Sequence, residues 1–138
     1  MKRIYFIALL PLMLLSFSSA ELYSQEKPEK VFLKGVEEAL KSASSKELSK
    51  FLHARVEIKL DNQRKEYSIN QAEIVLKDFF QSQPVSEADF MHDGNSAGGL
   101  IYAIGSYESG NSTFRLMVKA KKYKADYKVY HLEFTKER

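Results

Sequence analysis

Two short runs place a histidine close to a carboxylate, the pairing that general acid–base catalysis uses. In the first run, His92 is followed directly by Asp93. Successive side chains of a strand point to opposite faces of a sheet, so these two groups are expected to diverge. The run also begins a turn over residues 93–96, where aspartate commonly hydrogen-bonds the local backbone. We therefore favour a structural role for this pair over a catalytic one.

The second run, His131-Leu132-Glu133, places a histidine and a glutamate on one face of a predicted strand. Two such ligands begin a metal site only if a further ligand lies nearby, and neither His53 nor His92 stands at a recognised spacing. The chain has no cysteine, which excludes thiol catalysis and cysteine-based zinc sites. We expect a solvated strand face here, with no metal and no cofactor.

The glycines and serines do not form a recognised catalytic loop. No Lys-Ser or Lys-Thr follows Gly98-Gly99 at the spacing of a phosphate-binding loop, and the sequence has no Gly-x-Ser-x-Gly elbow of a serine hydrolase. Gly105 falls inside a predicted strand, which indicates a bulge or a bend in a curved sheet.

The beginning of the chain has the three parts of an export leader. Lys2 and Arg3 give a positive start, residues 4–17 are largely apolar, and small residues precede a cleavage point after Ala20. The apolar run is short for a membrane span, which needs about 20 residues. A retained membrane anchor is the alternative interpretation. We predict a signal peptide over residues 1–20 and one exported domain, periplasmic or secreted, over residues 21–138.

Charge along the chain argues against a nucleic-acid partner. The whole sequence has 21 Lys and Arg against 18 Asp and Glu. Two of the positive charges, Lys2 and Arg3, belong to the predicted leader, so the remaining chain is nearly neutral. Phosphate-backbone binding requires a basic stripe, which this balance does not indicate. We expect no nucleic acid, and no membrane contact after the leader is removed.

Helical periodicity and capping residues predict three helices. Apolar residues recur three and four positions apart over residues 31–43. Ser44 with Glu47, and Ser68 with Gln71, have the spacing of the capping box that begins a helix. The helices therefore lie mainly in the first half of the exported domain.

Strand patterns predict a sheet behind these helices. Residues 55–60 alternate between apolar and charged side chains, as in a half-buried strand, and residues 61–65 form a polar turn. Further strands are expected within residues 87–92, 100–108, 113–121 and 127–135. Their short turns predict an antiparallel meander. Helices that precede a meander are expected to pack on one of its faces, which gives the α+β class.

Several motifs along this pattern carry a family resemblance. They are Lys46-Glu47-Leu48-Ser49-Lys50-Phe51, Leu76-Lys77-Asp78-Phe79-Phe80, Pro84, His92-Asp93-Gly94, Tyr102-Ala103-Ile104-Gly105, Phe114-Arg115 and Tyr127-Lys128-Val129. With the order of elements, the chain resembles the exported bacterial family called domain of unknown function 4783. The resemblance covers nearly all of residues 30–136. It implies the nuclear transport factor 2-like (cystatin-like) fold, in which N-terminal helices pack on a curved antiparallel sheet to form a cone. It implies no activity.

Aromatic residues of the predicted strands suggest a ligand pocket inside the cone. If Tyr102 and Tyr130 face the helices, two phenol groups enter an otherwise apolar interior. Apolar walls with a few polar groups are typical of small-molecule sites. The expected pocket residues are Tyr102, Phe114, Leu116, Tyr130, Phe90 and Phe79. The alternative is that both tyrosines are core residues hydrogen-bonded to backbone or water.

The opposite face of the predicted sheet mixes apolar, aromatic and charged residues. Interfaces are enriched in Tyr, Met and Arg, so a homodimer through this face is a reasonable hypothesis. The residues expected at that interface are Tyr107, Arg115, Met117, Tyr127 and Val129. The alternative is an ordinary exposed face shielded by long side chains.

These patterns favour a binding protein over an enzyme. The leading interpretation is an exported, non-enzymatic domain that binds a small apolar ligand or a protein partner. An isomerase- or hydrolase-like enzyme is the alternative, and it requires Asp89, His92, Tyr102 or Tyr130 to converge on one cavity. A structural or assembly role as a homodimer is the third interpretation.

Overall fold

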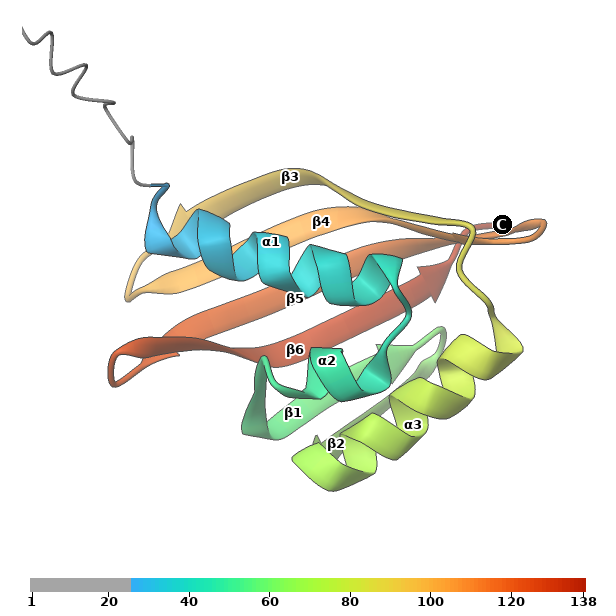
Figure 1. The fold of residues 1–138 in the computed structure, drawn as a ribbon, viewed down its shortest axis with the longest axis horizontal. Coiled ribbons are helices and arrows are strands. Elements are labelled where there is room, and N and C mark those ends of the chain that lie inside the picture. The colour runs from blue at the N-terminus through green and yellow to red at the C-terminus, as the bar shows by residue number, and fades with distance from the viewer. Residues whose placement is uncertain (1–25) are drawn as a thin grey trace, which may run out of the picture.

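Three helices cover one face of a curved, unclosed six-stranded sheet in the computed structural model, which describes residues 26–138 (Figure 1). The elements are α1 Pro28–Lys41, α2 Ser45–Ser49, β1 Leu52–Leu60, β2 Gln63–Ser68, α3 Ile69–Ser82, β3 Glu87–Ser96, β4 Leu100–Ser109, β5 Ser112–Tyr123 and β6 Asp126–Lys136. This confirms the α+β class. The predicted signal peptide, residues 1–20, lies outside the described residues. None of the helices between residues 26 and 138 is long and apolar enough to cross a membrane.

The sheet has the strand order β2-β1-β6-β5-β4-β3. Strands β3 to β6 form the predicted antiparallel meander, and β1 joins it by pairing parallel to β6. The predicted turn at residues 61–65 is wrong in extent, because β2 begins at Gln63 and pairs antiparallel with β1. Strand β2 is a polar edge strand, so it lacks the alternation that reveals a half-buried strand.

Side-chain caps begin α2 and α3 as predicted. The Glu47 amide donates to the Ser44 hydroxyl at 3.1 Å, which caps α2. At α3 the capping box is reciprocal, since the Gln71 amide donates to the Ser68 hydroxyl and the Gln71 side chain accepts from the Ser68 amide. These bonds satisfy backbone N–H groups that the first turn of a helix leaves without partners.

Aromatic side chains fill the space between α3 and the sheet. The Phe79 ring lies 4.5–5.6 Å from the rings of Phe134, Phe114 and Tyr107. Tyr107 is fully buried, and its hydroxyl donates to the Gln83 carbonyl at 2.6 Å. Burial raises the pKa of Tyr107 to about 12, so the phenol stays neutral and keeps this bond. The part of the cone where a ligand was expected is therefore packed with side chains.

The predicted facing of β4 is wrong. Ala103 pairs with Val118 and Tyr107 with Phe114, so these β4 residues share the core face of β5. Tyr102 consequently lies on the opposite face of the sheet, which none of the helices of residues 26–138 covers; we call it the helix-free face. Both faces of β4 hold apolar residues, so alternation alone does not select the buried one.

Gly105 lets β4 approach β3 on the core side. A Cβ atom at Gly105 would lie 1.9 Å from the Asp89 carbonyl oxygen. The β3–β4 register shifts between Phe90 and His92, so Met91 is an extra residue in β3 close to this contact. The predicted irregularity at Gly105 is thus a close backbone approach beside a bulge.

We predict that Gly105→Ala destabilises the fold by about 1–3 kcal/mol, the usual cost of forcing extra atoms into a packed site. The clash is with backbone, so no side-chain rotation relieves it. Urea unfolding of Gly105→Ala should show this loss, whereas the neighbouring Ser106→Ala should unfold close to the wild type. Equal stability of Gly105→Ala and the wild type would contradict the close approach.

Candidate functional site

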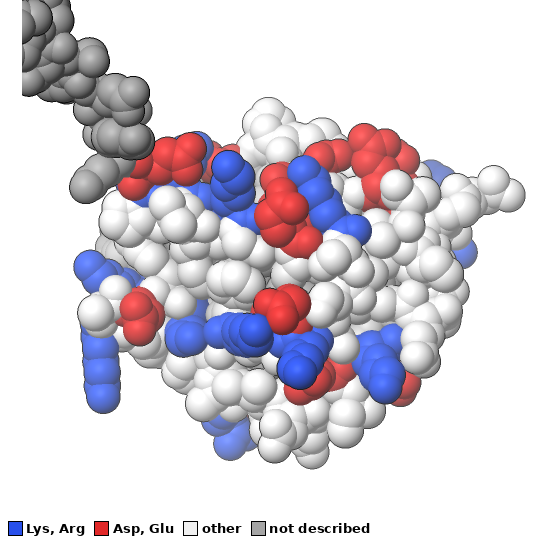
Figure 2. All heavy atoms as spheres, viewed as in Figure 1, with Lys and Arg blue, Asp and Glu red and all other residues white. Residues whose placement is uncertain are grey.

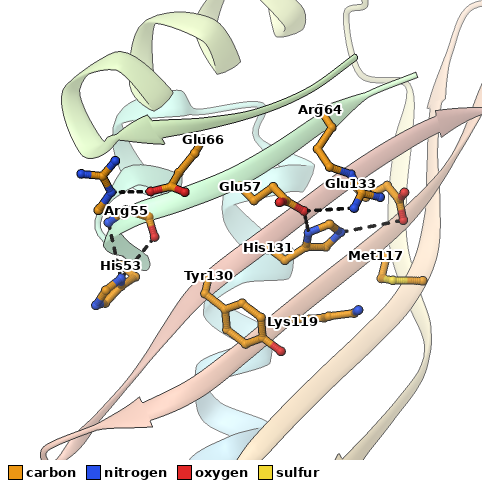
Figure 3. Close-up of a pocket in the computed structure, with 10 residues that line it drawn as sticks. All are labelled: His53, Arg55, Glu57, Arg64, Glu66, Met117, Lys119, Tyr130, His131 and Glu133. Atoms are coloured by element: carbon orange, nitrogen blue, oxygen red, sulfur yellow. Dashed lines mark hydrogen bonds and ion pairs between the residues drawn. The ribbon is translucent and has the colours of Figure 1, made fainter. Parts of the chain in front are cut away.

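Two adjoining hollows lie on the helix-free face of the sheet. The larger, the charged basin, has a volume of about 650 Å³ and is lined by His53, Arg55, Glu57, Arg64, Glu66, Met117, Lys119, Tyr130, His131 and Glu133 (Figure 3). The smaller, the apolar hollow, has a volume of about 270 Å³ and is lined by Ser96, Leu100, Ile101, Tyr102, Ile104, Met117, Lys119 and Tyr130. They share Met117, Lys119 and Tyr130, so they form one surface with a polar end and an apolar end.

A bulge in β6 turns the basin residues out of the core. Lys119 pairs with His131 but the next residue of β5, Ala120, pairs with Val129, which leaves Tyr130 as an extra residue. Val129 is fully buried, and strict alternation from it would direct His131 into the core. The bulge reverses the alternation, so His131 and Glu133 line the basin.

A chain of ion pairs crosses the basin floor. Parallel pairing of β1 with β6 sets Glu57 opposite His131 and Lys59 opposite Glu133. A Glu57 carboxylate oxygen lies 2.8 Å from His131 Nδ1 and 3.6 Å from an Arg64 nitrogen. His131 Nε2 lies 4.0 Å from Glu133, whose other oxygen is 2.9 Å from Lys59 Nζ. Figure 3 shows the imidazole between the two carboxylates, with Arg64 beside Glu57. Lys59 flanks Glu133 in the same way.

Glu133 is ionised in this chain although it is only 6% exposed. Burial on its own raises the pKa of a carboxyl group. Here the hydrogen bond and charge of Lys59, with smaller effects of His131 and Arg115, outweigh burial and hold the pKa of Glu133 below its usual value. A buried charge of this kind is tolerated only when it is paired.

The lining of the basin includes no Ser, Thr or Cys side chain, so His131 has no nucleophile to activate there. Among residues 26–138, no group of three His, Asp or Glu side chains could hold a metal ion.

Lys119 stands at the junction of the two hollows. It is half-buried, and no carboxylate of residues 26–138 lies within ion-pairing distance of its ammonium group. The Tyr130 phenol lies at the same junction and has no hydrogen-bond partner within that part of the chain. A bound anion would give both groups a partner.

Tyr102 forms one wall of the apolar hollow. It is 37% exposed, and its ring lies against Gly94 of β3, where a Cβ atom would come within 2.5 Å of the phenol oxygen. The glycine therefore makes room for this tyrosine on the helix-free face.

The structure separates the residues that were expected to share a pocket. Phe114 and Leu116 are buried in the core, and Phe79 and Phe90 pack against it. Tyr102 and Tyr130 line the apolar hollow on the other side of the sheet. The two tyrosines are thus brought together, but not with the four apolar residues.

The expected interface residues are separated as well. Tyr107 and Val129 are fully buried, so neither is available at a surface. Tyr127 turns toward α1, where its hydroxyl donates to Glu29 at 3.0 Å. Arg115 and Met117 lie on the helix-free side, since their β5 neighbours Phe114, Leu116 and Val118 face the core.

His92 and Asp93 diverge as predicted. Asp93 forms an ion pair with Lys30 of α1 at 2.7 Å, whereas His92 is exposed and pairs with Ile104. The sequence reasoning did not find Glu57 or Lys119 as site residues. Charged residues are common on strands and do not by themselves indicate a site. Only the β1–β6 pairing and the bulge bring these two residues beside His131.

We predict that Glu133→Gln lowers the free energy of unfolding by about 1–3 kcal/mol at pH 7, because a charged hydrogen bond to Lys59 is lost. A carboxyl group with a lowered pKa stabilises the fold above its ordinary pKa, near 4.5, and loses that effect as the pH falls through the lowered value. The difference from the wild type should therefore shrink in denaturant unfolding below pH 4.5. The exposed Glu137→Gln serves as the control, and an unchanged difference at low pH would contradict the ionised pair.

Comparisons with known proteins agree with this fold. The family described as "Domain of unknown function (DUF4783)" matches residues 33–135. No curated protein matches the chain.

Solved structures of the same family are similar. A DUF4783 family protein from Bacteroides uniformis is 25% identical, with a TM-score of 0.72, over 76% of this chain and 96% of that one. One from Bacteroides ovatus is 26% identical, with a TM-score of 0.72, over 75% of this chain and 94% of that one. An NTF2-like protein of unknown function from Shewanella baltica shares the fold at 16% identity and a TM-score of 0.60, over 79% and 90% of the two chains. The predicted family and cone fold are thus confirmed.

Proposed function

The chain belongs to the DUF4783 family, and we propose that it binds a small amphipathic anion on the helix-free face of its sheet, without catalysing a reaction on it. One observation carries this proposal: the charged basin and the apolar hollow share Met117, Lys119 and Tyr130. A ligand at this junction meets a cation and a phenol on one side and an apolar surface on the other.

The apolar hollow supports a ligand with a hydrocarbon body. Leu100, Ile104 and Met117 line it, and Tyr102 adds an aromatic wall. Each methylene group that leaves water for such a surface contributes about 0.8 kcal/mol. The hollow is at the small end of the range for ligand sites, which suits a slender chain better than a multi-ring compound.

The charges of the basin support an anionic head group. Arg55 is paired with Glu66, and Arg64 lies beside Glu57, so these cations already have partners. Lys119 has none among residues 26–138 and stands where the apolar hollow begins. A carboxylate on the ligand would pair with it in a partly desolvated position, where such a bond is stronger than in open water.

The predicted leader supports binding outside the cytoplasm. Residues 1–20 have the pattern of a signal peptide, so we place this ligand in the periplasm or the medium.

Calorimetric titration with decanoate, and with decanol as its uncharged match, tests the proposal. We expect saturable decanoate binding that Lys119→Met weakens about tenfold or more, because it removes one charge-assisted hydrogen bond. Decanol binding should hardly change in this variant. Lys65→Met removes an exposed lysine of β2 that lies outside both hollows and serves as the control. An absence of decanoate binding, or equal decanoate affinity of Lys119→Met and the wild type, would sink the proposal.

A second copy of the chain is the second candidate occupant of this face. Tyr102 remains 37% exposed on it, and Met117 and Arg115 lie on the neighbouring strand. Light scattering distinguishes the two candidates. A monomer mass at high concentration supports the small ligand, whereas a dimer that Tyr102→Asp dissociates supports the homodimer.

A further inference from the structure

The hairpin of β5 and β6 holds a concentration of positive charge, of which the ligand proposal uses only Lys119. Residues 119–128, the lysine hairpin, contain five lysines and a single carboxylate, Asp126, for a net charge of +4. The rest of residues 21–138 carries a net charge of −3. None of these five lysines forms an ion pair within residues 26–138, although many cations elsewhere in that part do.

Four of the five lysines, all except Lys119, gather at one end of the sheet. Lys121, Lys122 and Lys124 are exposed around the β5–β6 turn, and Lys128 donates to the carbonyl of Lys50, the C-cap residue of α2. Figure 2 shows Lys and Arg side chains standing out at the left edge, where Figure 1 places this turn. The charges thus form a patch at the tip of the molecule and not a stripe along it.

An aromatic ring stands among these lysines. The Tyr123 ring stacks on His53 at 4.0 Å, and the Lys121 ammonium lies 5.0 Å from its centroid. Tyrosine next to lysine is the composition of protein surfaces that meet the head-group region of a bilayer, because the ring has an apolar body and a polar end. A site for a fully hydrated polyanion requires no such ring.

The start of the described chain lies beside the lysine hairpin. Tyr127 bonds Glu29 of α1, and its ring lies 5.8 Å from that of Phe32. The predicted cleavage after Ala20 removes the leader, so the hairpin itself must supply any contact with a membrane.

We propose that the lysine hairpin docks on the surface of a membrane that contains anionic phospholipid. Phosphate head groups supply negative charge to the four lysines at its tip, and clusters of four to eight basic residues bind such surfaces. The negative remainder of the domain is repelled, so the hairpin faces the membrane and the rest points away. The net charge of residues 21–138 is near zero because the positive hairpin and the negative remainder nearly cancel. This net charge therefore does not predict the contact.

Vesicle sedimentation tests this docking, with protein recovered from cells that express the full chain. The vesicles contain phosphatidylglycerol and phosphatidylcholine at 30:70, or phosphatidylcholine alone. We expect binding to the anionic vesicles only, and weaker binding at higher salt. Each lysine contributes roughly a fivefold gain in affinity, so Lys121→Gln, Lys122→Gln and Lys124→Gln together should weaken binding about 100-fold.

A matched variant removes the same charge elsewhere. Lys65→Gln, Lys77→Gln and Lys136→Gln together change three exposed lysines outside the hairpin and should retain vesicle binding. Thermal unfolding confirms that both triple variants are folded. Equal loss in the two triple variants, or no loss in the hairpin variant, would overturn the proposal.

Substitution of Tyr123 distinguishes binding to a membrane from binding to a soluble polyanion. Tyr123→Ser should weaken binding to the anionic vesicles several-fold and leave the weak binding of dextran sulfate unchanged. Tight binding of dextran sulfate without binding to the vesicles would overturn the membrane proposal in favour of a soluble polyanion.

Discussion

One extra residue in β6 decides which of its side chains lie on the helix-free face. Tyr130 interrupts the alternation, so Val129 before it and Leu132 after it both face the core. The same shift sends His131 and Glu133 to the other side. A strand has a side-chain period of two, so without the bulge the charged pair would be buried under the helices. The chemistry of the candidate site therefore depends on this single irregularity.

The parallel pairing of β1 with β6 offsets the free-energy cost of burying the charged residues that this irregularity redirects. It supplies Glu57 and Lys59 to the two residues that the bulge turns outward. Each buried charge then has a partner of opposite sign, which offsets the cost of removing it from water. Within residues 26–138 no carboxylate forms an ion pair with Lys119, and our proposal assigns this lysine to the ligand.

Local signals were enough to predict the helices, the meander and the α+β class, and the family resemblance supplied the cone fold. These signals involve residues close together in the sequence: the capping residues Ser44 and Ser68, the helical periodicity and the meander turns. Strand β2 was missed because it is polar on both sides, and the facing of β4 was wrong because that strand is apolar on both sides. The site could not be predicted, since the Tyr130 bulge and the β1–β6 register depend on contacts between distant segments. A ligand inside the cone was expected because Tyr102 and Tyr130 were predicted to face the helices. The aromatic side chains around Phe79 fill that space instead.

The central claim is that the helix-free face of the sheet, and not the interior of the cone, receives the ligand. Methyl NMR spectra recorded during a decanoate titration test this most directly. The account predicts saturable shift changes at the methyl groups of Leu100, Ile104 and Met117, which line the apolar hollow. Changes concentrated at Leu116 and Val118, which face the helices from the same sheet, would place the ligand in the core and contradict the account.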